Sequence, residues 1–367
     1  RWQARITLYL GRSAGFWDNG TLWIISLVPD CEIKMTPIRF AVFGARHWHV
    51  LEIAHAIRAD ERFELVGVAE PHEETRHQVQ TELQIPAFTS HREMLDADAV
   101  DAVAVASINN ERVEVIADAL AAGVHVLADK PMVVSLDQLD QVEAAVRSSQ
   151  ATLSCALTLR FTPHFVAAKA AIDRGEIGQV IGSYAQGPHK LGVARRPAWM
   201  FNREKYGGVL LDLAVHDIDV ARWIHGAEPV AVVADEGSSR FADLDFADYA
   251  SVYLRMADGS VAVCRSSWLT PDDDPSHGDR RLIVEGTEGS LEIVDAAERR
   301  LTINSAGTVE TRTNVREEMV GQPDAMAELV GDFAHGISGE APQLITARET
   351  IESHRWTLKA RGQAESA

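Results

Sequence analysis

The spacing of hydrophobic residues changes near residue 158, and this change divides the sequence into two parts. From Ile38 to residue 157, short apolar runs alternate with amphipathic stretches that have helical spacing. Continuous apolar strands separated by helices are typical of a parallel sheet covered on both faces. Right-handed crossovers then give a Rossmann-type arrangement, predicted for residues 35–157. The runs expected as strands are IRFAVF, FELVGVA, AVDAVAVA, VHVLAD and ATLSCAL.

Beyond residue 158 the pattern indicates strands that follow one another without helices between them. Two helix-like stretches precede the runs PVAVVAD, YASVYLRM, SVAVCRSSW, RRLIVEG, SLEIV, LTIN and TVETRT. Turns at 257–259 and 286–289 separate neighbouring runs, as in hairpins. The predicted fold class is therefore α/β, with an N-terminal Rossmann-type parallel sheet and a C-terminal α+β domain. That second domain, residues 158–345, carries a large, mostly antiparallel open sheet, and residues 346–367 form a closing helix.

The first 34 residues differ from the rest of the chain. They hold three of the eight tryptophans and no methionine before Met35, where MTPIRFAVFGA reads as a natural start. We expect residues 1–34 to be a non-native or disordered extension without function, with a swapped arm that covers a partner subunit as the alternative. Their longest apolar run, TLWIISLV, is far shorter than the ~18 residues of a membrane span, and no signal-peptide cleavage site comes after it.

Acidic residues outnumber basic ones, and the formal net charge is −19 at pH 7. This charge argues against nucleic acids and anionic membranes as main partners, although local arginines could still bind a small anionic substrate. The 46% of hydrophobic residues permits a substantial core. Cys31, Cys155 and Cys264 are widely separated and form no metal-ligand pattern, so reduced thiols in a cytoplasmic protein are expected.

The first strand runs into the turn FGARHWH, which partly matches a dinucleotide-binding fingerprint. Gly44 occupies the first glycine position, whereas Arg46 and His49 replace the other two glycines. Glu70 ends the next strand, 26 positions later, where an acid suits both ribose hydroxyls and repels a 2′-phosphate. NAD is therefore favoured over NADP, although Arg46 could meet a phosphate. Alternatively, Glu70 caps the helix after Pro71. The candidate cofactor contacts are Gly44, Ala45, Arg46, His47 and Glu70.

The fourth strand ends in Asp129-Lys130-Pro131. Proline favours an extended conformation in the residue before it, and this places Lys130 at the sheet edge where ligands bind in open α/β folds. A lysine there could donate to a substrate hydroxyl or lower the pKa of a nearby acid. Taken alone, it could equally be an ordinary surface lysine.

The apolar segment GGVLLDLAVHDID, residues 207–219, contains acids and a histidine at helical spacing. Asp212, His216 and Asp219 lie four and three positions apart, which places them on one helical face. Buried groups of this kind are costly unless they are paired, so they either satisfy one another or line a cleft. An anionic Asp212 is expected to raise the pKa of His216 and orient its ring. Asp219 is expected to be structural, bonded to backbone or to an arginine such as Arg222.

In combination these motifs resemble the glucose-fructose oxidoreductase, inositol dehydrogenase and rhizopine-catabolism family. The shared pattern is a Rossmann unit, an acid-Lys-Pro turn about 85 residues after the glycine turn, and GGxxxDxxxHxxD in an α+β domain. The resemblance extends from about Met35 to the C-terminus and takes in RFTP, GEIG and EGTEG. The stretches GPHKL and RPAWMF suggest a subgroup of the family.

The resemblance implies a nicotinamide-dependent oxidoreductase that moves hydride between NAD(H) and a sugar- or polyol-like secondary alcohol or ketone. Lys130 matches the lysine that contacts substrate and nicotinamide. Asp212 matches the acid of the cleft, and His216 the imidazole that exchanges the hydroxyl proton. Ser107 and Asn109 match the loop beside the cofactor. The chain departs from the pattern at Ile108 and Arg112, which replace that loop's proline and histidine, and at Asp129, which replaces a glutamate.

The polar and aromatic segment 189–206 is the expected substrate side of the cleft. Candidate substrate contacts are Arg160, His189, Trp199 and Tyr206, and the cations Lys190, Arg195 and Arg196 could also line the mouth. No metal site is expected, because the Asp212/His216 pair lacks further ligands. A homodimer or homotetramer is expected through the open sheet. Two other functions stay open: a sugar lyase or hydrolase that uses NAD for transient oxidation, and a non-catalytic dinucleotide-binding sensor or scaffold.

Overall fold

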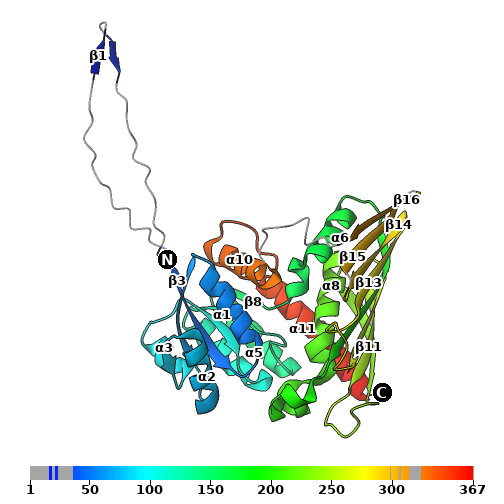
Figure 1. The fold of residues 1–367 in the computed structure, drawn as a ribbon, viewed down its shortest axis with the longest axis horizontal. Helices are drawn as coiled ribbons and strands as arrows, with labels where there is room; N and C mark the ends of the chain where they lie inside the picture. The colour runs from blue at the N-terminus through cyan, green and yellow to red at the C-terminus, as the bar shows by residue number, and fades with distance from the viewer. Residues whose placement is uncertain are drawn as a thin grey trace.

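A computed structural model describes residues 16–18, 21–23, 36–297, 299–305, 307–313 and 324–366. Within them, two domains lie side by side, each built on one sheet (Figure 1). The strands β1 (Phe16–Asp18) and β2 (Thr21–Trp23) pair with each other as a short antiparallel ribbon. Apart from this ribbon, the extension expected over residues 1–34 lies outside the described residues.

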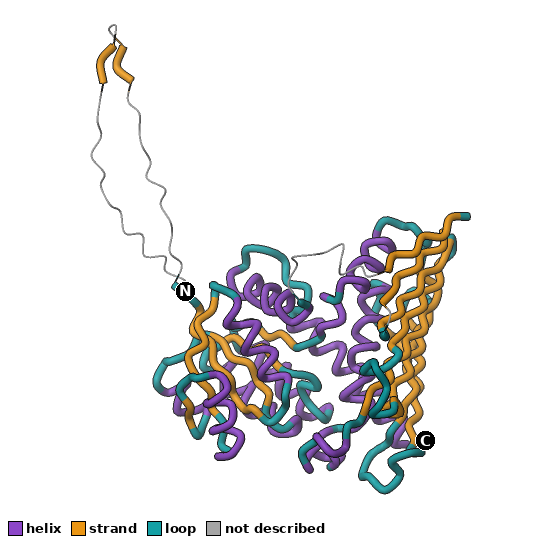
Figure 2. Tube along the Cα trace, viewed as in Figure 1, coloured by secondary structure: helices purple, strands orange, loops and turns teal. Residues whose placement is uncertain are grey.

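The first domain is a six-stranded parallel sheet with helices on both faces (Figure 2). Its central strands are almost wholly buried, and all five residues of β6 are enclosed, which explains the uninterrupted apolar sequence of β6. The strand order is β5-β4-β3-β6-β7-β8. The strands are β3 (Ile38–Ala45), β4 (Phe63–Ala69), β5 (Ala87–Phe88), β6 (Ala102–Ala106), β7 (His125–Ala128) and β8 (Leu153–Cys155). The helices are α1 (His49–Ala59), α2 (Glu73–Leu83), α3 (His91–Asp96), the short η1 (Asn109–Glu111), α4 (Arg112–Ala121) and α5 (Leu136–Ser148).

The second domain is an eight-stranded sheet in the order β10-β11-β12-β9-β13-β14-β15-β16. Neighbouring strands of this sheet are antiparallel except β9 and β12, which run parallel to each other at its centre. The predicted fold class is therefore confirmed for both domains. The strands are β9 (Val180–Lys190), β10 (Pro229–Gly237), β11 (Tyr249–Met256), β12 (Val261–Thr270), β13 (Arg280–Gly286), β14 (Gly289–Asp295), β15 (Arg299–Ser305) and β16 (Thr308–Thr313).

Helices cover only one face of this second sheet, the face turned toward the first domain (Figure 1). They are α6 (Pro163–Asp173), α8 (Val215–His225) and α11 (Ala347–Ser366), with the short turns η2 (Thr158–Phe161), η3 (Val193–Arg195), η4 (Ala198–Phe201), α7 (Arg203–Tyr206) and η5 (Leu210–Ala214) nearby. No helix of the described residues covers the other face. Tyr184 pairs across strands with Ile283, and both are exposed there.

The C-terminal helices connect the two domains. Helix α10 (Ala325–Ser338) packs on α1, and its Phe333 ring lies 6.3 Å from that of Phe40 in the first core. The expected division at residue 345 therefore needs correction for this segment, because α10 covers the Rossmann sheet. Helix α11 contributes Ile351 to the first core and Trp356 to the second. No helix among the described residues is long and apolar enough to cross a membrane.

Candidate active site

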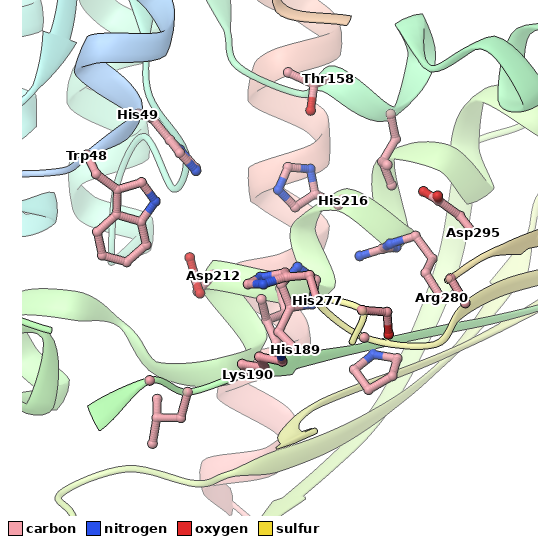
Figure 3. Close-up of a pocket in the computed structure, with 18 of the residues that line it drawn as sticks. Trp48, His49, Thr158, His189, Lys190, Asp212, His216, His277, Arg280 and Asp295 are labelled. Atoms are coloured by element: carbon pink, nitrogen blue, oxygen red, sulfur yellow. The ribbon is translucent and has the colours of Figure 1, made fainter. Parts of the chain in front are cut away.

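A cleft of about 960 Å³ opens between the two domains at the carboxyl edge of the Rossmann sheet. From the first domain it is lined by Trp48, His49 and Lys130. From the second it is lined by His189, Asp212 and His216, together with His277 of the loop before β13 and Arg280, the first residue of β13 (Figure 3). Ligands of open α/β sheets bind at this edge, so the cleft has the position expected of an active site.

Lys130 and Asp212 form a buried ion pair across the domain boundary. Lys130 Nζ donates to Asp212 Oδ1 at 2.7 Å and to the Asp212 carbonyl oxygen at 3.2 Å. Burial alone would raise the pKa of Asp212, but the cations Lys130 and Arg196 outweigh it and hold that pKa well below its usual range. Asp212 is thus an anion at neutral pH, and its two oxygens hold the Lys130 side chain at the cleft.

His216 lies beside this pair without bonding to it. Its Nδ1 is buried and has no hydrogen-bond partner among the described residues. Burial, Lys130 and Arg280 lower the pKa of His216 well below its ordinary value, and Asp212 opposes them only in part. Asp212 thus acts on the pKa of His216 in the expected direction, but burial and the two cations outweigh it, so the net pKa is lowered. His216 is therefore neutral at neutral pH and able to accept a proton. That Asp212 orients the His216 ring stays a prediction.

The helix that carries these residues begins irregularly. Gly207 and Gly208 have φ of +97° and +83°, and a Cβ on Gly207 would lie 2.6 Å from Leu211. The next turn, η5, is π-helical and contains Asp212, and α8 continues from Val215. A π turn inserts an extra residue and often marks a functional site. Asp212 and His216 line the cleft, whereas Asp219, which lies in α8 with His216, does not, contrary to the expectation of one common face.

Asp219 instead forms an interior pair with Arg160. Arg160 Nε and a terminal nitrogen donate to the two Asp219 carboxylate oxygens at 2.8 and 2.7 Å, and Arg160 also bonds Glu349 at 2.8 Å. Ser353 Oγ donates to the same carboxylate at 2.7 Å. The structural role expected for Asp219 fits this geometry, with Arg160 rather than Arg222 as its partner. Arg160, a candidate substrate contact, does not line the cleft, because its guanidinium is buried in these bonds.

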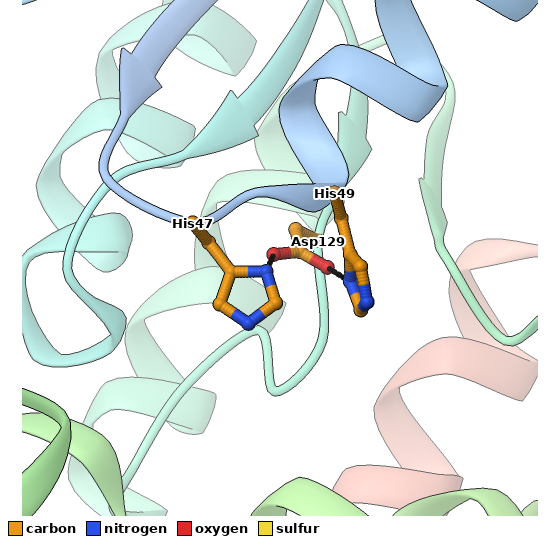
Figure 4. Close-up of side chains that lie close together, drawn as sticks. All are labelled: His47, His49 and Asp129. Atoms are coloured by element: carbon orange, nitrogen blue, oxygen red, sulfur yellow. Dashed lines mark hydrogen bonds and ion pairs between the residues drawn. The ribbon is translucent and has the colours of Figure 1, made fainter. Parts of the chain in front are cut away.

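Asp129 is the centre of a second buried cluster. The Nδ1 atoms of His47 and His49 each lie 2.9 Å from one of its oxygens (Figure 4). Arg112 donates to Asp129 Oδ2 at 3.0 Å and also to the carbonyl oxygens of Asp129 and Pro131. Arg112 thus holds the turn that presents Lys130, and this explains how the chain accommodates an arginine at that loop position.

Within the described part of the chain, His47, His49 and Asp129 form one group whose donor atoms could hold a metal ion. The Arg112 guanidinium already pairs with the carboxylate, and the Lys130 backbone N–H donates to it at 2.8 Å. Burial lowers the pKa of His47 to about 4, so its imidazole is neutral, and its Nδ1 lies close to Asp129 without forming a hydrogen bond of good geometry. These contacts favour a hydrogen-bonded cluster, and the absence of a metal site stays a prediction.

The glycine turn lies against the β6 loop, as a cofactor site requires. Gly44 has φ of +75°, and a Cβ there would lie 2.5 Å from that of Ser107. Ser107 Oγ and Asn109 Oδ1 are buried and have no hydrogen-bond partner among the described residues. Two orphaned polar atoms beside the turn fit a dinucleotide, which would supply donors and acceptors there. Ala45 and Arg46 continue this turn.

Glu70 stands at the expected strand end, but its carboxylate faces the backbone. It accepts hydrogen bonds from the N–H groups of Ala45 at 2.7 Å and His72 at 2.8 Å, and it is 1% exposed. This geometry ties the glycine turn to β4 and to the start of α2, as in the capping alternative. Each carboxylate oxygen keeps further lone pairs, so contact with a ribose stays a prediction.

Of the remaining candidate substrate contacts, one lines the cleft and two lie behind its wall. His189 lines the cleft, and its ring lies 4.7 Å from that of His277. Tyr206 is buried behind Asp212, where its hydroxyl hydrogen-bonds that carboxylate and accepts from Arg196 at 2.7 Å. Trp199 packs edge-to-face on Tyr206 at 5.7 Å and is buried. Trp199 and Tyr206 therefore support the wall of the cleft and do not line it.

The cations of the segment after β9 lie where the sequence pattern places them, at the cleft. Lys190, Arg195 and Arg196 all line it. Arg196 also lies over the rings of Trp48, Tyr206 and Trp268 at 5.3 to 5.6 Å. These rings hold the guanidinium in place beside Asp212.

His49 and Arg280 are among the cleft residues that sequence reasoning missed. His49 stands at a replaced glycine position, and the run of three ring-bearing side chains at 47–49 was the available signal. Arg280 begins β13, and the alternation of polar and apolar residues in that strand gives no sign of a site residue. It bonds the buried Asp217, a neighbour of His216 in the chain, and no local pattern predicts this contact across 63 residues.

Two family models match the chain. Residues 38–157 match the oxidoreductase family with an NAD-binding Rossmann fold, and residues 165–292 match the GFO/IDH/MocA C-terminal domain. The chain belongs to the Gfo/Idh/MocA family of oxidoreductases. The resemblance drawn from the motifs is thereby confirmed, as is an NAD-binding first domain.

Individual relatives agree with this assignment. The chain is 31% identical to the uncharacterized oxidoreductase YrbE of Bacillus subtilis (strain 168), over 62% of this chain and 65% of that protein, just under two thirds of its length. It is 28% identical to scyllo-inositol 2-dehydrogenase (NAD(+)) of the same strain, over 73% and 77%. The structure of aldose-aldose oxidoreductase from Caulobacter crescentus, complexed with glycerol, superimposes with a TM-score of 0.77. It covers 90% of this chain and 98% of that one at 21% identity, which shows a shared fold.

Proposed function

We propose that this protein is a dehydrogenase or reductase that transfers hydride between NAD(H) and a CH–OH group of a sugar- or polyol-like substrate. The observation that carries the proposal is the Lys130–Asp212 ion pair beside a neutral His216, in a cleft at the carboxyl edge of an NAD-binding Rossmann sheet. The inositol dehydrogenase and aldose oxidoreductase relatives support a polyhydroxylated substrate.

The three side chains have complementary roles in alcohol oxidation. When bound, NAD⁺ supplies the hydride acceptor. Lys130 donates a hydrogen bond to the reacting hydroxyl oxygen and stabilises the negative charge that develops on it. His216 is the general base that accepts the hydroxyl proton, and it returns the proton in ketone reduction. Asp212 holds the Lys130 side chain in place, while Tyr206 holds Asp212 from behind.

The residues around the glycine turn would hold the cofactor. Gly44, Ala45, Arg46 and His47 form the turn, and Ser107 and Asn109 offer the orphaned oxygens beside it. NAD is the proposed cofactor, because Glu70 brings a negative charge to the ribose end. NADP is the alternative, since the only side-chain hydrogen bond of Arg46 within the described ranges is to Thr75 Oγ1 at 3.5 Å, which leaves the guanidinium able to meet a 2′-phosphate.

A homodimer or homotetramer through the open face of the second sheet is part of the proposal. Tyr184 and Ile283 are 38% and 37% exposed, and Tyr253 is 44% exposed two strands away. An apolar sheet face of this kind usually marks a protein–protein contact. Sedimentation of the purified protein tests this part separately.

The first experiment is a melting-temperature titration with NAD and with NADP, followed by turnover assays on neutral and acidic sugars and polyols. Ligands that bind the native state raise its melting temperature, so NAD is expected to give the larger shift. Lys130→Met is expected to lower turnover by at least about 100-fold while keeping most of the NAD shift. Lys169→Met, which removes a lysine of α6 outside the cleft, is the control. Full turnover in Lys130→Met, or the lack of any shift, would contradict the proposal.

A further inference from the structure

The cleft has an electrostatic character opposite to that of the chain. The whole sequence has a net charge of −19. Charged side chains that line the cleft are nonetheless mostly cationic: Lys130, Lys190, Arg195, Arg196, Arg280 and Arg299, against the acids Glu52, Asp212 and Asp295. A cleft lined by one sign of charge focuses its field and attracts ligands of the other sign.

Half of these cations have carboxylate partners. Lys130 bonds Asp212, Arg280 bonds the buried Asp217, and Arg299 Nε lies 3.0 Å from Asp295 Oδ1. In each of these pairs the carboxylate neutralises the charge of the cation, so these three cations do not require an anionic ligand.

The other three cations come from one short segment at the end of β9 and just after it, and they lack such partners. Lys190 Nζ donates to the carbonyl oxygen of Asp274. Arg196 donates to the Leu191 carbonyl oxygen at 2.5 Å and to the Tyr206 hydroxyl. No ion pair within 4 Å is found for Lys190, Arg195 or Arg196 among the described residues. Neutral oxygens orient Lys190 and Arg196. The carboxylates of Asp274 and Asp212 interact with these two cations only through space and form no ion pair with them within 4 Å among the described residues.

The same three cations converge on one part of the cleft. After burial, the largest influence lowering the pKa of His277 is Lys190, followed by Arg196, Lys130 and Arg195. His189 contacts His277, and burial together with Arg280 and His277 lowers its pKa to about 3. Both imidazoles are thus neutral near pH 7 and can donate hydrogen bonds. Figure 3 shows His189, Lys190 and His277 gathered beside Asp212.

We propose that the substrate carries an anionic group, a carboxylate or a phosphate, which binds Lys190, Arg195 and Arg196 while its reacting hydroxyl faces Lys130 and His216. This inference rests on the proposed function and narrows its substrate class to acidic or phosphorylated sugars and polyols. Arginines suit either anion, because their planar guanidinium can bind two oxygens at once. Arg196 is held in position by the aromatic rings beside it, so its side chain loses less conformational entropy when an anion binds.

The test is calorimetric titration of the NAD-saturated protein with matched probes. D-glucose is compared with D-glucuronate and D-glucose 6-phosphate, myo-inositol is compared with myo-inositol 1-phosphate, and inorganic phosphate is titrated alone. At least one anionic sugar or polyol is expected to bind about 10-fold or more tightly than its neutral counterpart, and added salt should reduce the difference. The tighter of glucuronate and glucose 6-phosphate identifies a carboxylate or a phosphate subsite.

Two charge-matched variants locate the effect. Arg195→Gln is expected to reduce the preference for the anion by about 10-fold, because it removes one charge-assisted contact. Arg147→Gln, on the surface of α5, makes the same change in net charge outside the cleft and should leave the preference unchanged. Equal effects of the two variants would show a general field and would overturn the subsite.

Failure of this inference can be told apart from failure of the proposed function. Turnover of a neutral polyol without preference for any anion would retain the oxidoreductase and overturn the anion subsite. The subsite is also overturned if no anionic probe binds more tightly than its neutral counterpart. Conversely, anion binding that depends on Arg195 in a protein that neither binds a nicotinamide cofactor nor turns over would keep the subsite and overturn the proposed function.

Discussion

Asp212 and Asp219 lie on the same helical segment and each pairs with a cation, but their surroundings differ. Asp219 is enclosed, and both of its oxygens accept hydrogen bonds from Arg160 while Ser353 adds a third bond. Asp212 lines the cleft, and the cation it holds, Lys130, also lines the space where a substrate would bind. An enclosed ion pair whose oxygens are all hydrogen-bonded stabilises the fold. An ion pair that lines a cleft leaves its charged groups within reach of a substrate.

Breaking the interior pair is expected to give the largest effect. Arg160→Ala leaves the Asp219 carboxylate buried without its cation, and this should lower the free energy of unfolding by about 3–5 kcal/mol. Urea denaturation measures this change, and turnover per folded molecule should be preserved. Lys169→Ala, which breaks a surface pair with Asp173, should cost less than about 1 kcal/mol. A similar loss of unfolding free energy in both variants would show that the buried Arg160–Asp219 pair stabilises the fold no more than a surface pair does.

The interior end also predicts a dependence of stability on pH. Burial lowers the pKa of His354 to about 4, and its Nε2 accepts from the Met132 N–H at 2.9 Å. Between pH 6.5 and 4 the unfolded chain binds a proton at this residue and the folded chain does not. Stability therefore falls as the pH is lowered through this window, by about 3 kcal/mol from His354 if the shift is fully expressed.

Comparison with a variant isolates this contribution. His354→Gln should flatten the pH dependence of the urea midpoint between these pH values by up to one proton, with little change above pH ~7 apart from a constant offset. An unchanged slope would place the titration on other buried histidines, such as His47.

At the cleft end, substitution should affect turnover more than stability. His216→Asn removes the proposed base and is expected to reduce turnover by at least about 100-fold, equivalent to about 2.7 kcal/mol. The melting-temperature shift with NAD should persist, because the cofactor contacts are on the other domain. His55→Asn, which changes an exposed histidine on α1, serves as the control. Normal turnover in His216→Asn would assign proton transfer to another group.

The smallest expected effect concerns the cofactor loop. Ser107→Ala removes an orphaned hydroxyl that has no partner among the described residues. If that hydroxyl bonds the dinucleotide, NAD affinity should fall about 5-fold, since a typical hydrogen bond contributes about 1 kcal/mol. Fluorescence titration with NADH measures the change. An unchanged affinity would show that the hydroxyl bonds only water in the complex.

The sequence predicted the two sheets well, because strand patterning and turn residues act locally. The apolar runs of residues 38–157 and the alternating runs after residue 229 each became strands of the expected domain. Lys130 could be placed because it follows a buried strand and precedes a proline. Arg160 could not, since nothing near it in the chain indicates that Asp219, 59 residues away, would take up its guanidinium.

Taken by itself, the sequence determined the strands, the glycine turn with its positive φ, and the segment that carries Asp212 and His216. These features depend on periodicity and backbone geometry, which extend over only a few residues. Only the tertiary structure decided which oppositely charged side chains form ion pairs. Lys130 meets Asp212 across 82 residues and a domain boundary, and Arg160 binds Asp219 in the interior across 59 residues. Ion pairing acts through space, so partners and pKa values depend on how the domains pack.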